Sequence, residues 1–235
     1  MEENKTVKYF KYAIGEIVLV VIGILIALTI NNYSEKKKAL IKEQAFLKEV
    51  NLDFKSNKVQ LDSIIEFNKV SFHASNRLLN IFKFFDLKKP EKNKSNAHVA
   101  DSIRVYNPLV WRNKSFNPKN GTVEALLNSS SFSLIQNDTL RRYLISWKDV
   151  LGDYLEEEKL AVNFLKNEYE PWLRKSFEPD LDDPENTKAL FSKRHRNFIY
   201  KRRGDLKNNI DAVNDEGVVD MINNIIRLTE TKNNN

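Results

Sequence analysis

Cysteine is absent from the chain, which excludes disulfide bonds, thiolate metal sites and a cysteine nucleophile. Histidine is scarce, and His73, His98 and His195 show no paired spacing that would hold a metal ion. The phosphate-binding, dinucleotide-binding and serine-hydrolase motifs are also missing. The sequence therefore indicates no catalytic residue, and we expect neither enzymatic activity nor a cofactor.

Glycine and proline are rare as well, with six of each among 235 residues, and this favours long helices over a turn-rich β fold. The length gives room for one domain and an anchor. The formal net charge of +6 is mildly basic. Such a balance suits anionic lipid or nucleic acid, but it is equally common on ordinary solvated surfaces.

One long apolar run is present near the N-terminus. Residues 13–30 carry Glu16 as their one charged side chain, and a helix of this length spans about 27 Å, enough to cross a bilayer core. The run is longer than the core of a cleaved signal peptide and has no small-residue cleavage pattern. Aromatic residues at both ends fit the interfacial belts of a membrane helix, namely Tyr9, Phe10, Tyr12 and Tyr33. We predict a tail over 1–12 and a transmembrane anchor over 13–33, with a signal peptide and a buried core helix as alternatives.

Glu16 has two interpretations. It can lie at interface depth, paired with Lys8 or Lys11, or it can join this helix to another one. The second is supported by small residues at four-residue spacing, which let helices approach closely. The candidate association residues are Gly15, Glu16, Gly23 and Ala27. The expected partners are the lipid bilayer and another membrane helix, from a second copy or from a different protein.

The stretch KYFKYAIGEIVLVVIGILIALTINNYSE, residues 8–35, resembles the anchor of a family of uncharacterised single-pass membrane proteins from Gram-negative bacteria. Their shared anchor reads YAIGEI-LVVIGILIAL-INNW-E, and Tyr33 stands where tryptophan is usual. A looser similarity covers residues 116–144. Lysines flank the run almost equally on both sides, so charge alone does not orient it. The resemblance implies an inner-membrane protein with a cytoplasmic N-terminus and a periplasmic C-terminal domain, and it implies no activity.

Helical periodicity dominates the rest of the chain. Apolar residues recur every seven positions over 34–86, which predicts a helix there. The membrane helix can run on into this helix without a break. Residues 87–121 hold three prolines and predict an irregular connection whose second half packs on the bundle through Tyr106, Trp111 and Phe116. The polar residues Asn57 and Asn68 interrupt the seam of the first helix, so it is expected to pack within its own chain instead of forming a coiled coil.

Further helices are predicted over 121–129, 138–170 and 186–230, the last broken near Gly204, with a frayed tail over 233–235. Asn137 or Asp138 caps the second of these, and Pro171 ends or kinks it. Its core face is formed by Leu140, Leu144, Trp147, Leu151, Tyr154, Leu155 and Val162, while the acidic run LEEEK at 155–159 indicates a solvated face. The fold class is therefore all-α, with an N-terminal transmembrane helix and a soluble antiparallel helical bundle over 34–232.

The densest basic run covers residues 192–203. Its charges are Lys193, Arg194, Arg196, Lys201, Arg202 and Arg203, with Phe198 and Tyr200 between them. Such a pattern can bind nucleic acid. In a periplasmic domain an anionic lipid surface or an acidic partner replaces it, so no nucleic acid is expected. The alternative is a charged helix face offset by the acidic spacer that precedes it.

These features favour a membrane-anchored helical module that works by protein or membrane association, as a scaffold or complex subunit. The alternative is an extracytoplasmic helical-bundle sensor with a ligand cleft near Trp111, Trp147 and Trp172. Because the tail over 1–12 is too short for an output domain, such a sensor would signal through a partner.

Overall fold

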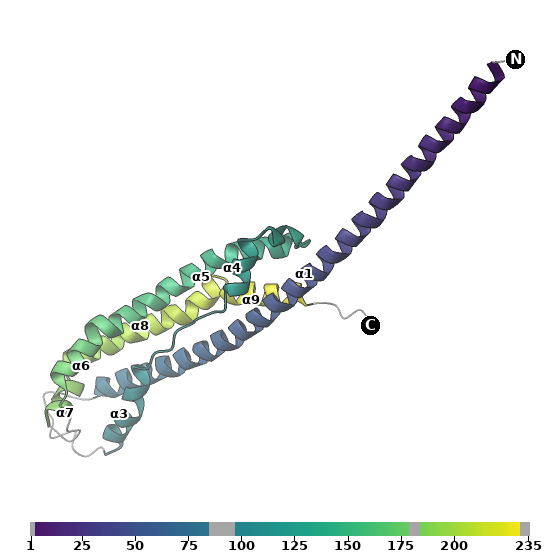
Figure 1. The fold of residues 1–235 in the computed structure, drawn as a ribbon. Coiled ribbons are helices and arrows are strands. Elements are labelled where there is room, and N and C mark those ends of the chain that lie inside the picture. Colours follow the sequence, from purple (N-terminus) through teal and green to yellow (C-terminus); the bar gives the residue numbers. More distant parts are fainter. Residues whose placement is uncertain (1–2, 85–96, 179–183, 231–235) are drawn as a thin grey trace.

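The computed structural model describes residues 3–84, 97–178 and 184–230, and these residues contain helices and no strand. The all-α prediction is confirmed. The elements in chain order are α1 (Glu3–Phe84), α3 (Ala97–Val110), α4 (Gly121–Leu127), the 3-10 helix η1 (Ser130–Leu134), α5 (Asp138–Phe164), the π-helical turn η2 (Leu165–Tyr169), α6 (Glu170–Ser176), α7 (Pro184–Leu190), α8 (Lys193–Asp215) and α9 (Val218–Thr229) (Figure 1).

Helix α1 is continuous over 82 residues. Its N-terminal half projects away from the rest of the molecule, and its C-terminal half packs into the bundle (Figure 1). Neither glycine nor proline occurs between Gly23 and the end of α1, so nothing in the backbone interrupts the hydrogen-bond ladder. The prediction that the apolar helix runs on into the first bundle helix is confirmed.

Three long helical rods form the bundle: the C-terminal half of α1, α5, and α8 followed by α9 (Figure 1). The third rod runs antiparallel to α1, because Asn51 of α1 contacts Thr229 at the end of α9 while Phe82 contacts Phe191 just before α8. Helix α5 runs parallel to α1. The predicted antiparallel arrangement therefore holds for α8–α9, whereas the chain returns from the far end through an irregular segment before it starts α5.

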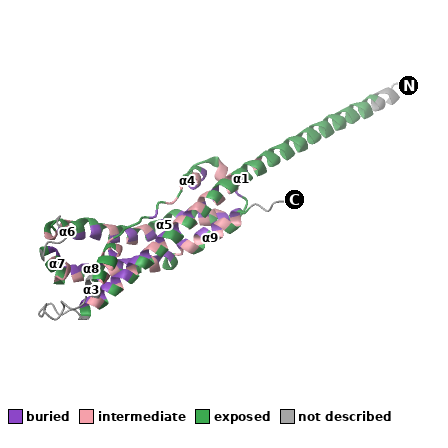
Figure 2. Cartoon of the chain, turned by 90° about the horizontal axis from the view of Figure 1, so that it is seen from below, coloured by how far each residue is buried: buried purple, intermediate pink, exposed green. Residues whose placement is uncertain are grey.

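The core lies along the inner faces of these rods (Figure 2). Phe54 of α1 meets Trp147 of α5 edge-on at 5.0 Å between ring centroids. Of the predicted core face of α5, Leu155 and Val162 are half-buried and the other five side chains are buried. Each fully buried large apolar side chain contributes about 1.5–3 kcal/mol, so this core drives the assembly of the bundle.

The prediction of an irregular connection over 87–121 was wrong for 97–110, which form α3; residues 87–96 lie outside the described residues. Proline normally disfavours a helix interior. Pro108, however, lies in the last turn of α3, and Ile103 and Val110 are buried against α1, so packing overrides the local preference. The predicted packing of the second half is confirmed, because Tyr106 and Trp111 are half-buried and Phe116 is buried.

The predicted break near Gly204 was also wrong. Helix α8 passes through Gly204. The predicted helix over 186–230 is interrupted instead at residues 191–192, between α7 and α8, and at Gly217, whose φ of 71° lies in the left-handed region. Before Pro171 the helix widens into η2 and continues as α6 to Ser176. The π-helical turn lies where the proline ring would clash with the carbonyl of Asn167 in a regular α-helix.

Candidate functional site

The N-terminal part of α1 carries most of the exposed large apolar side chains of the described residues. Side chains such as Ile17 and Leu19 are 63% and 73% exposed. Helix α1 is long and apolar enough to cross a membrane, and none of its most apolar 18-residue window is buried within the protein. The alternative of a buried core helix is therefore wrong.

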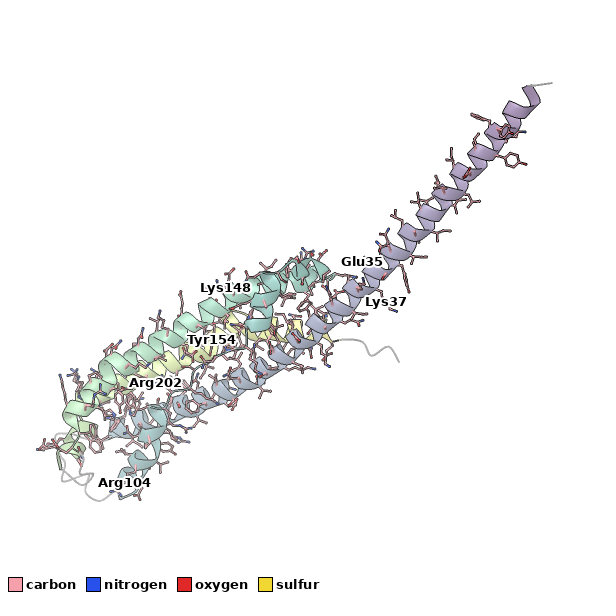
Figure 3. All side chains as sticks on the ribbon, in the orientation of Figure 1. Glu35, Lys37, Arg104, Lys148, Tyr154 and Arg202 are labelled. Carbon is pink, nitrogen blue, oxygen red and sulfur yellow. The ribbon has the colours of Figure 1, made fainter. Side chains whose placement is uncertain are left out.

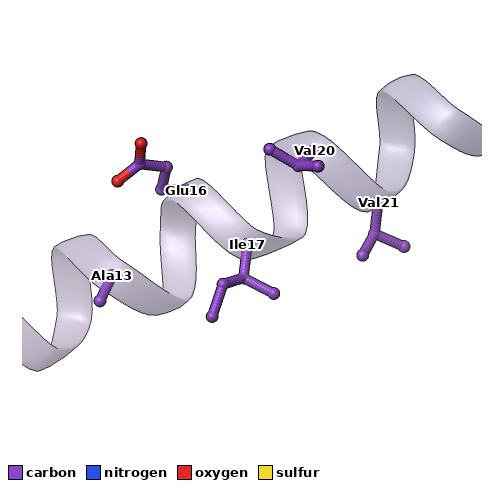
Figure 4. Close-up of a pocket in the computed structure, with 5 residues that line it drawn as sticks. All are labelled: Ala13, Glu16, Ile17, Val20 and Val21. Atoms are coloured by element: carbon purple, nitrogen blue, oxygen red, sulfur yellow. The ribbon is translucent and has the colours of Figure 1, made fainter.

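Glu16 lies on this exposed segment beside four apolar side chains of neighbouring turns, Ala13, Ile17, Val20 and Val21 (Figure 4). A Cβ atom added at Gly15 or Gly23 would meet nothing within 4 Å, so the helix surface at both glycines is open. Association through Gly15, Glu16, Gly23 and Ala27 stays a prediction. On this helix Gly15 lies about 100° around the axis from Glu16, so the two do not share one face.

Residues 111–120, here called the crossover, run back along α1 and connect α3 to α4. Asn57 of α1 holds the end of this segment through both backbone groups of Lys119. Glu158 of α5 accepts hydrogen bonds from the Phe116 N–H at 3.0 and 3.2 Å. Arg202 of α8 donates to the carbonyl of Val110, the last residue of α3, and to the carbonyl of Arg112 in the crossover. Each rod therefore supplies one buried polar side chain that fixes the backbone of the crossover.

Arg202 was predicted to contact an anionic surface, and this is wrong, because it is 1% exposed and lies inside the bundle (Figure 3). The pKa of its guanidinium is lowered to about 10, because the lowering by burial exceeds the opposing effect of the nearby Asp205 carboxylate. The prediction failed here because a guanidinium can satisfy carbonyl oxygens in the interior as well as anions at the surface.

The five other basic residues do not form one patch. Arg194 and Lys201 lie on one side of α8, and the three on the other side are Lys193, Arg196 and Arg203. Lys201 already forms an ion pair with Asp205. Arg194 lies over the ring of Phe198 at 5.5 Å. Nothing in this arrangement gathers the charges toward a single anionic ligand.

The acidic run at 155–159 was predicted as a solvated face, and this is wrong for Glu158, which is 6% exposed. Burial raises the pKa of its carboxyl group above the ordinary value, while the hydrogen bonds from the Phe116 backbone and the Ser115 side chain oppose the rise. The side chain is occupied by these contacts with the crossover.

A second group, the distal aromatic cluster, surrounds His195 and comprises Trp111, Tyr169, Trp172, Phe198 and Phe82. The rings of Trp111 and Tyr169 stack at 3.6 Å, and those of Trp172 and His195 stack at 5.4 Å. His195 Nδ1 lies 2.7 Å from the carbonyl oxygen of Leu190, and Nε2 has no hydrogen-bond partner among the described residues. Burial lowers the pKa of His195 to about 4, so the ring is neutral at neutral pH.

The predicted ligand cleft near three tryptophans does not form as one site. Trp111 and Trp172 belong to the distal aromatic cluster, whereas Trp147 is buried in the main core and donates to Asn120 Oδ1 at 2.8 Å. Of the three histidines, His195 is buried in the distal aromatic cluster, His73 is exposed on α1, and the side chain of His98 lies outside the described residues.

Sequence reasoning missed the polar contacts to the crossover. A signal was available, because Asn57 lies on the apolar stripe between Phe54 and Leu61. A polar residue at a core position needs a partner in the interior, and an irregular segment offers unpaired backbone groups.

Comparison with known proteins matches residues 16–164 to a family of unknown function, DUF6090. The chain belongs to this family. The matched region begins at Glu16 and includes most of the apolar run, the crossover, Asn57 and Glu158, and it ends before α6. No curated protein and no solved structure matches the chain.

Proposed function

We propose that this member of the DUF6090 family is a single-pass membrane protein that works by binding and not by catalysis, as a scaffold or a complex subunit. Residues 13–33 anchor it in the inner membrane, and the helical bundle lies on the periplasmic side. The observation that supports this most directly is the continuity of α1, which joins an exposed apolar segment to the bundle core without a loop.

The rigid connection matters physically. A flexible linker would let the bundle reorient freely relative to the membrane. A continuous helix fixes both the distance and the rotation of the bundle with respect to the bilayer. Such a connection is useful when a surface must meet a membrane-bound partner in one orientation. The buried polar side chains Asn57, Glu158 and Arg202 support the same interpretation, because they fix the chain's own backbone and are not directed toward an open site.

Two measurements test the proposal on the full chain. After alkaline extraction of membranes the protein should stay in the membrane pellet. A variant that carries both Ile22→Glu and Ile26→Glu should be released into the supernatant. A reporter enzyme that works only in the periplasm should be active when it is fused to the C-terminus of the chain. After extraction in mild detergent, affinity purification should retain a partner, and a strictly monomeric, partnerless protein would refute a role in binding.

A second candidate is the extracytoplasmic sensor, and the continuity of α1 favours it too. A change at the distal end would reach the membrane through one helix, and the sensor would then signal through a partner. Small molecules that raise the unfolding temperature of the protein would support this function. A screen in which none does so would count against it.

A further inference from the structure

We infer that the outward face of α1 is a self-association surface on which a second copy of this chain packs in parallel, in register and along both the membrane segment and the bundle. The inference rests on the proposed membrane anchoring. It names the partner of three predicted association residues, Glu16, Gly23 and Ala27, leaves out Gly15, which lies about 100° around the helix from Glu16, and extends the surface out of the membrane.

The surface is a repeat that appears once α1 is known to be one helix. Five helical turns take 18 residues, so Glu16, Ser34, Leu52 and Val70 lie at the same angle around the axis. Residues seven and eleven positions after the first three deviate from that angle by only about 20°. These further residues are Gly23, Ala27, Ile41, Ala45, Val59 and Ser63. Together the ten residues are here called the outer stripe.

All ten residues of the outer stripe are exposed. The four large apolar ones, Ile41, Leu52, Val59 and Val70, are 58%, 59%, 70% and 47% exposed. Core residues of α1 such as Phe54 and Leu61 lie on the opposite side of the helix. Ser63 accepts a hydrogen bond from Lys114 of the crossover at 2.6 Å, and the four large apolar residues of the stripe lie outside the core that closes the bundle. Apolar residues aligned along a solvent-facing helix indicate an interaction surface.

A second copy fits this surface better than an unrelated protein for a geometric reason. Two copies anchored in one membrane share direction and depth, so each residue of the stripe meets its own equivalent. The repeat averages 3.6 residues per turn, and the stripe therefore runs along a straight helix without winding around it. Small residues lie within the membrane segment, where close approach favours association, and larger apolar residues lie outside it, where water drives burial.

One pair of charges beside the stripe agrees with a parallel pair. Lys48 and Glu49 flank it on opposite sides, so a two-fold axis parallel to the helices brings Lys48 of each copy beside Glu49 of the other. Both side chains are exposed, and within the described part of the chain neither has an ion-pair partner. Closer to the far end, Asp62 and Glu66 lie beside the stripe, and each pairs within its own chain, with Lys58 and Lys69.

Disulfide crosslinking tests the inference, and the cysteine-free chain needs no background mutations. Full-length protein carrying Leu52→Cys or Val59→Cys is oxidised in its native membranes. A disulfide requires Cβ atoms about 3.5–4.5 Å apart, so only a close parallel pair in register links equivalent residues. Both variants should give several-fold more dimer than Leu160→Cys, whose parent side chain is 58% exposed on α5, and than Asp62→Cys on a flank of α1.

Further variants separate the possible outcomes. Adding Val59→Asp to Leu52→Cys should lower the dimer yield about tenfold, since charges enter the interface of both copies, while Leu160→Asp should not. Three outcomes would overturn the inference. The dimer yield could be equal at stripe and control positions, the disulfide could join Leu52→Cys of one copy to Val59→Cys of another in place of equivalent residues, or the links could form only to a different protein. If these occur while the protein resists alkaline extraction, membrane anchoring stands. Release of the protein by alkaline extraction would refute both proposals.

Discussion

Asn57 and Lys119, 62 positions apart in the sequence, form a two-way hydrogen-bonded pair. Asn57 Nδ2 donates to the Lys119 carbonyl oxygen at 3.0 Å, and the Lys119 N–H donates to Asn57 Oδ1 at 2.7 Å. The side-chain amide of Asn57 thus serves as hydrogen-bond partner for both the N–H and the carbonyl of Lys119, as a neighbouring backbone would in regular secondary structure. Because Asn57 is 1% exposed, water cannot take its place without opening the bundle.

Replacing Asn57 by leucine should destabilise the protein by about 2–4 kcal/mol. The N–H and the carbonyl of Lys119 would both lose the side-chain amide that is their hydrogen-bond partner. Urea unfolding of the full chain in detergent micelles, followed by tryptophan fluorescence, measures this change. Asn80→Leu, at an exposed position of the same helix, is the matched control and should change the free energy of unfolding by less than about 0.5 kcal/mol. Equal effects of the two substitutions would contradict the assigned role.

His195 should make the bundle less stable on acidification. Its pKa is lowered from 6.5 to about 4 in the folded protein, so between these values the unfolded chain binds a proton that the folded one does not. Stability from this group is therefore present above pH 6.5 and lost as pH falls toward 4. The loss amounts to at most about 3 kcal/mol. His195→Phe should remove this pH dependence, whereas His73→Phe, at an exposed position, should retain it.

Glu158 should act with the opposite sign. Burial raises its pKa above 4.5, so its contribution to stability is fully present below pH 4.5 and is lost as pH rises through the raised value. Relative to the wild type, Glu158→Gln should therefore become more stable as pH increases from 4.5 to neutrality. The urea midpoint measured at several pH values tests this. The exposed neighbour Glu156 provides the control, and a Glu156→Gln variant with the same pH profile as Glu158→Gln would exclude the assignment.

Gly204 and Gly217, both in the third rod, should change the stability of the protein in opposite directions when each is replaced by alanine. Gly217 has a left-handed φ, where a side chain costs about 1–2 kcal/mol, so Gly217→Ala should lower stability. Gly204 lies within α8, and Gly204→Ala should raise stability by about 0.8–1.0 kcal/mol. A Cβ at either position meets nothing within 4 Å, so steric contacts do not complicate the comparison. Thermal unfolding of both variants should show shifts of opposite sign.

The sequence predicted what depends on local pattern. Periodic apolar residues located α1 and α5, and Asn137 caps α5 as expected by accepting a hydrogen bond from the Leu140 N–H. It failed where a distant contact decides the structure. Helix α3 contains Pro108, and only its packing against α1 compensates for that residue. The break at Gly217 in place of Gly204 depends on backbone conformation, which glycine permits at both positions.

The polar residues show the same limit more clearly. Asn57 was interpreted as an interruption of the apolar seam, Glu158 as part of a solvated face and Arg202 as a surface charge. All three are buried because they bind the crossover. Since α1 and α5 run parallel, the chain between the end of α1 and the start of α5 has to run back along the bundle, and the crossover is part of this return. Such contacts carry no periodic signature, so single-sequence reasoning had no means to pair them.

The last prediction concerns Glu16, whose carboxylate stands in an otherwise apolar membrane segment. Facing lipid, a carboxylate costs roughly 2.5–3.5 kcal/mol at mid-membrane and less near the interface, and an apolar residue would avoid this cost. Facing a second helix, it can take part in hydrogen bonds worth about 0.6–2 kcal/mol. Glu16→Leu should therefore leave membrane insertion intact or improve it, yet weaken association between anchors.

Gly23→Leu should weaken association too, because a large side chain on the outer stripe blocks close approach. Gly15→Leu is the matched control, since that glycine is equally open but lies about 100° around the helix from Glu16. Crosslinking of the Leu52→Cys background in membranes measures all three variants. If Glu16→Leu and Gly23→Leu leave the dimer yield unchanged, Glu16 is an interfacial residue and the anchor contributes no contact to the pair.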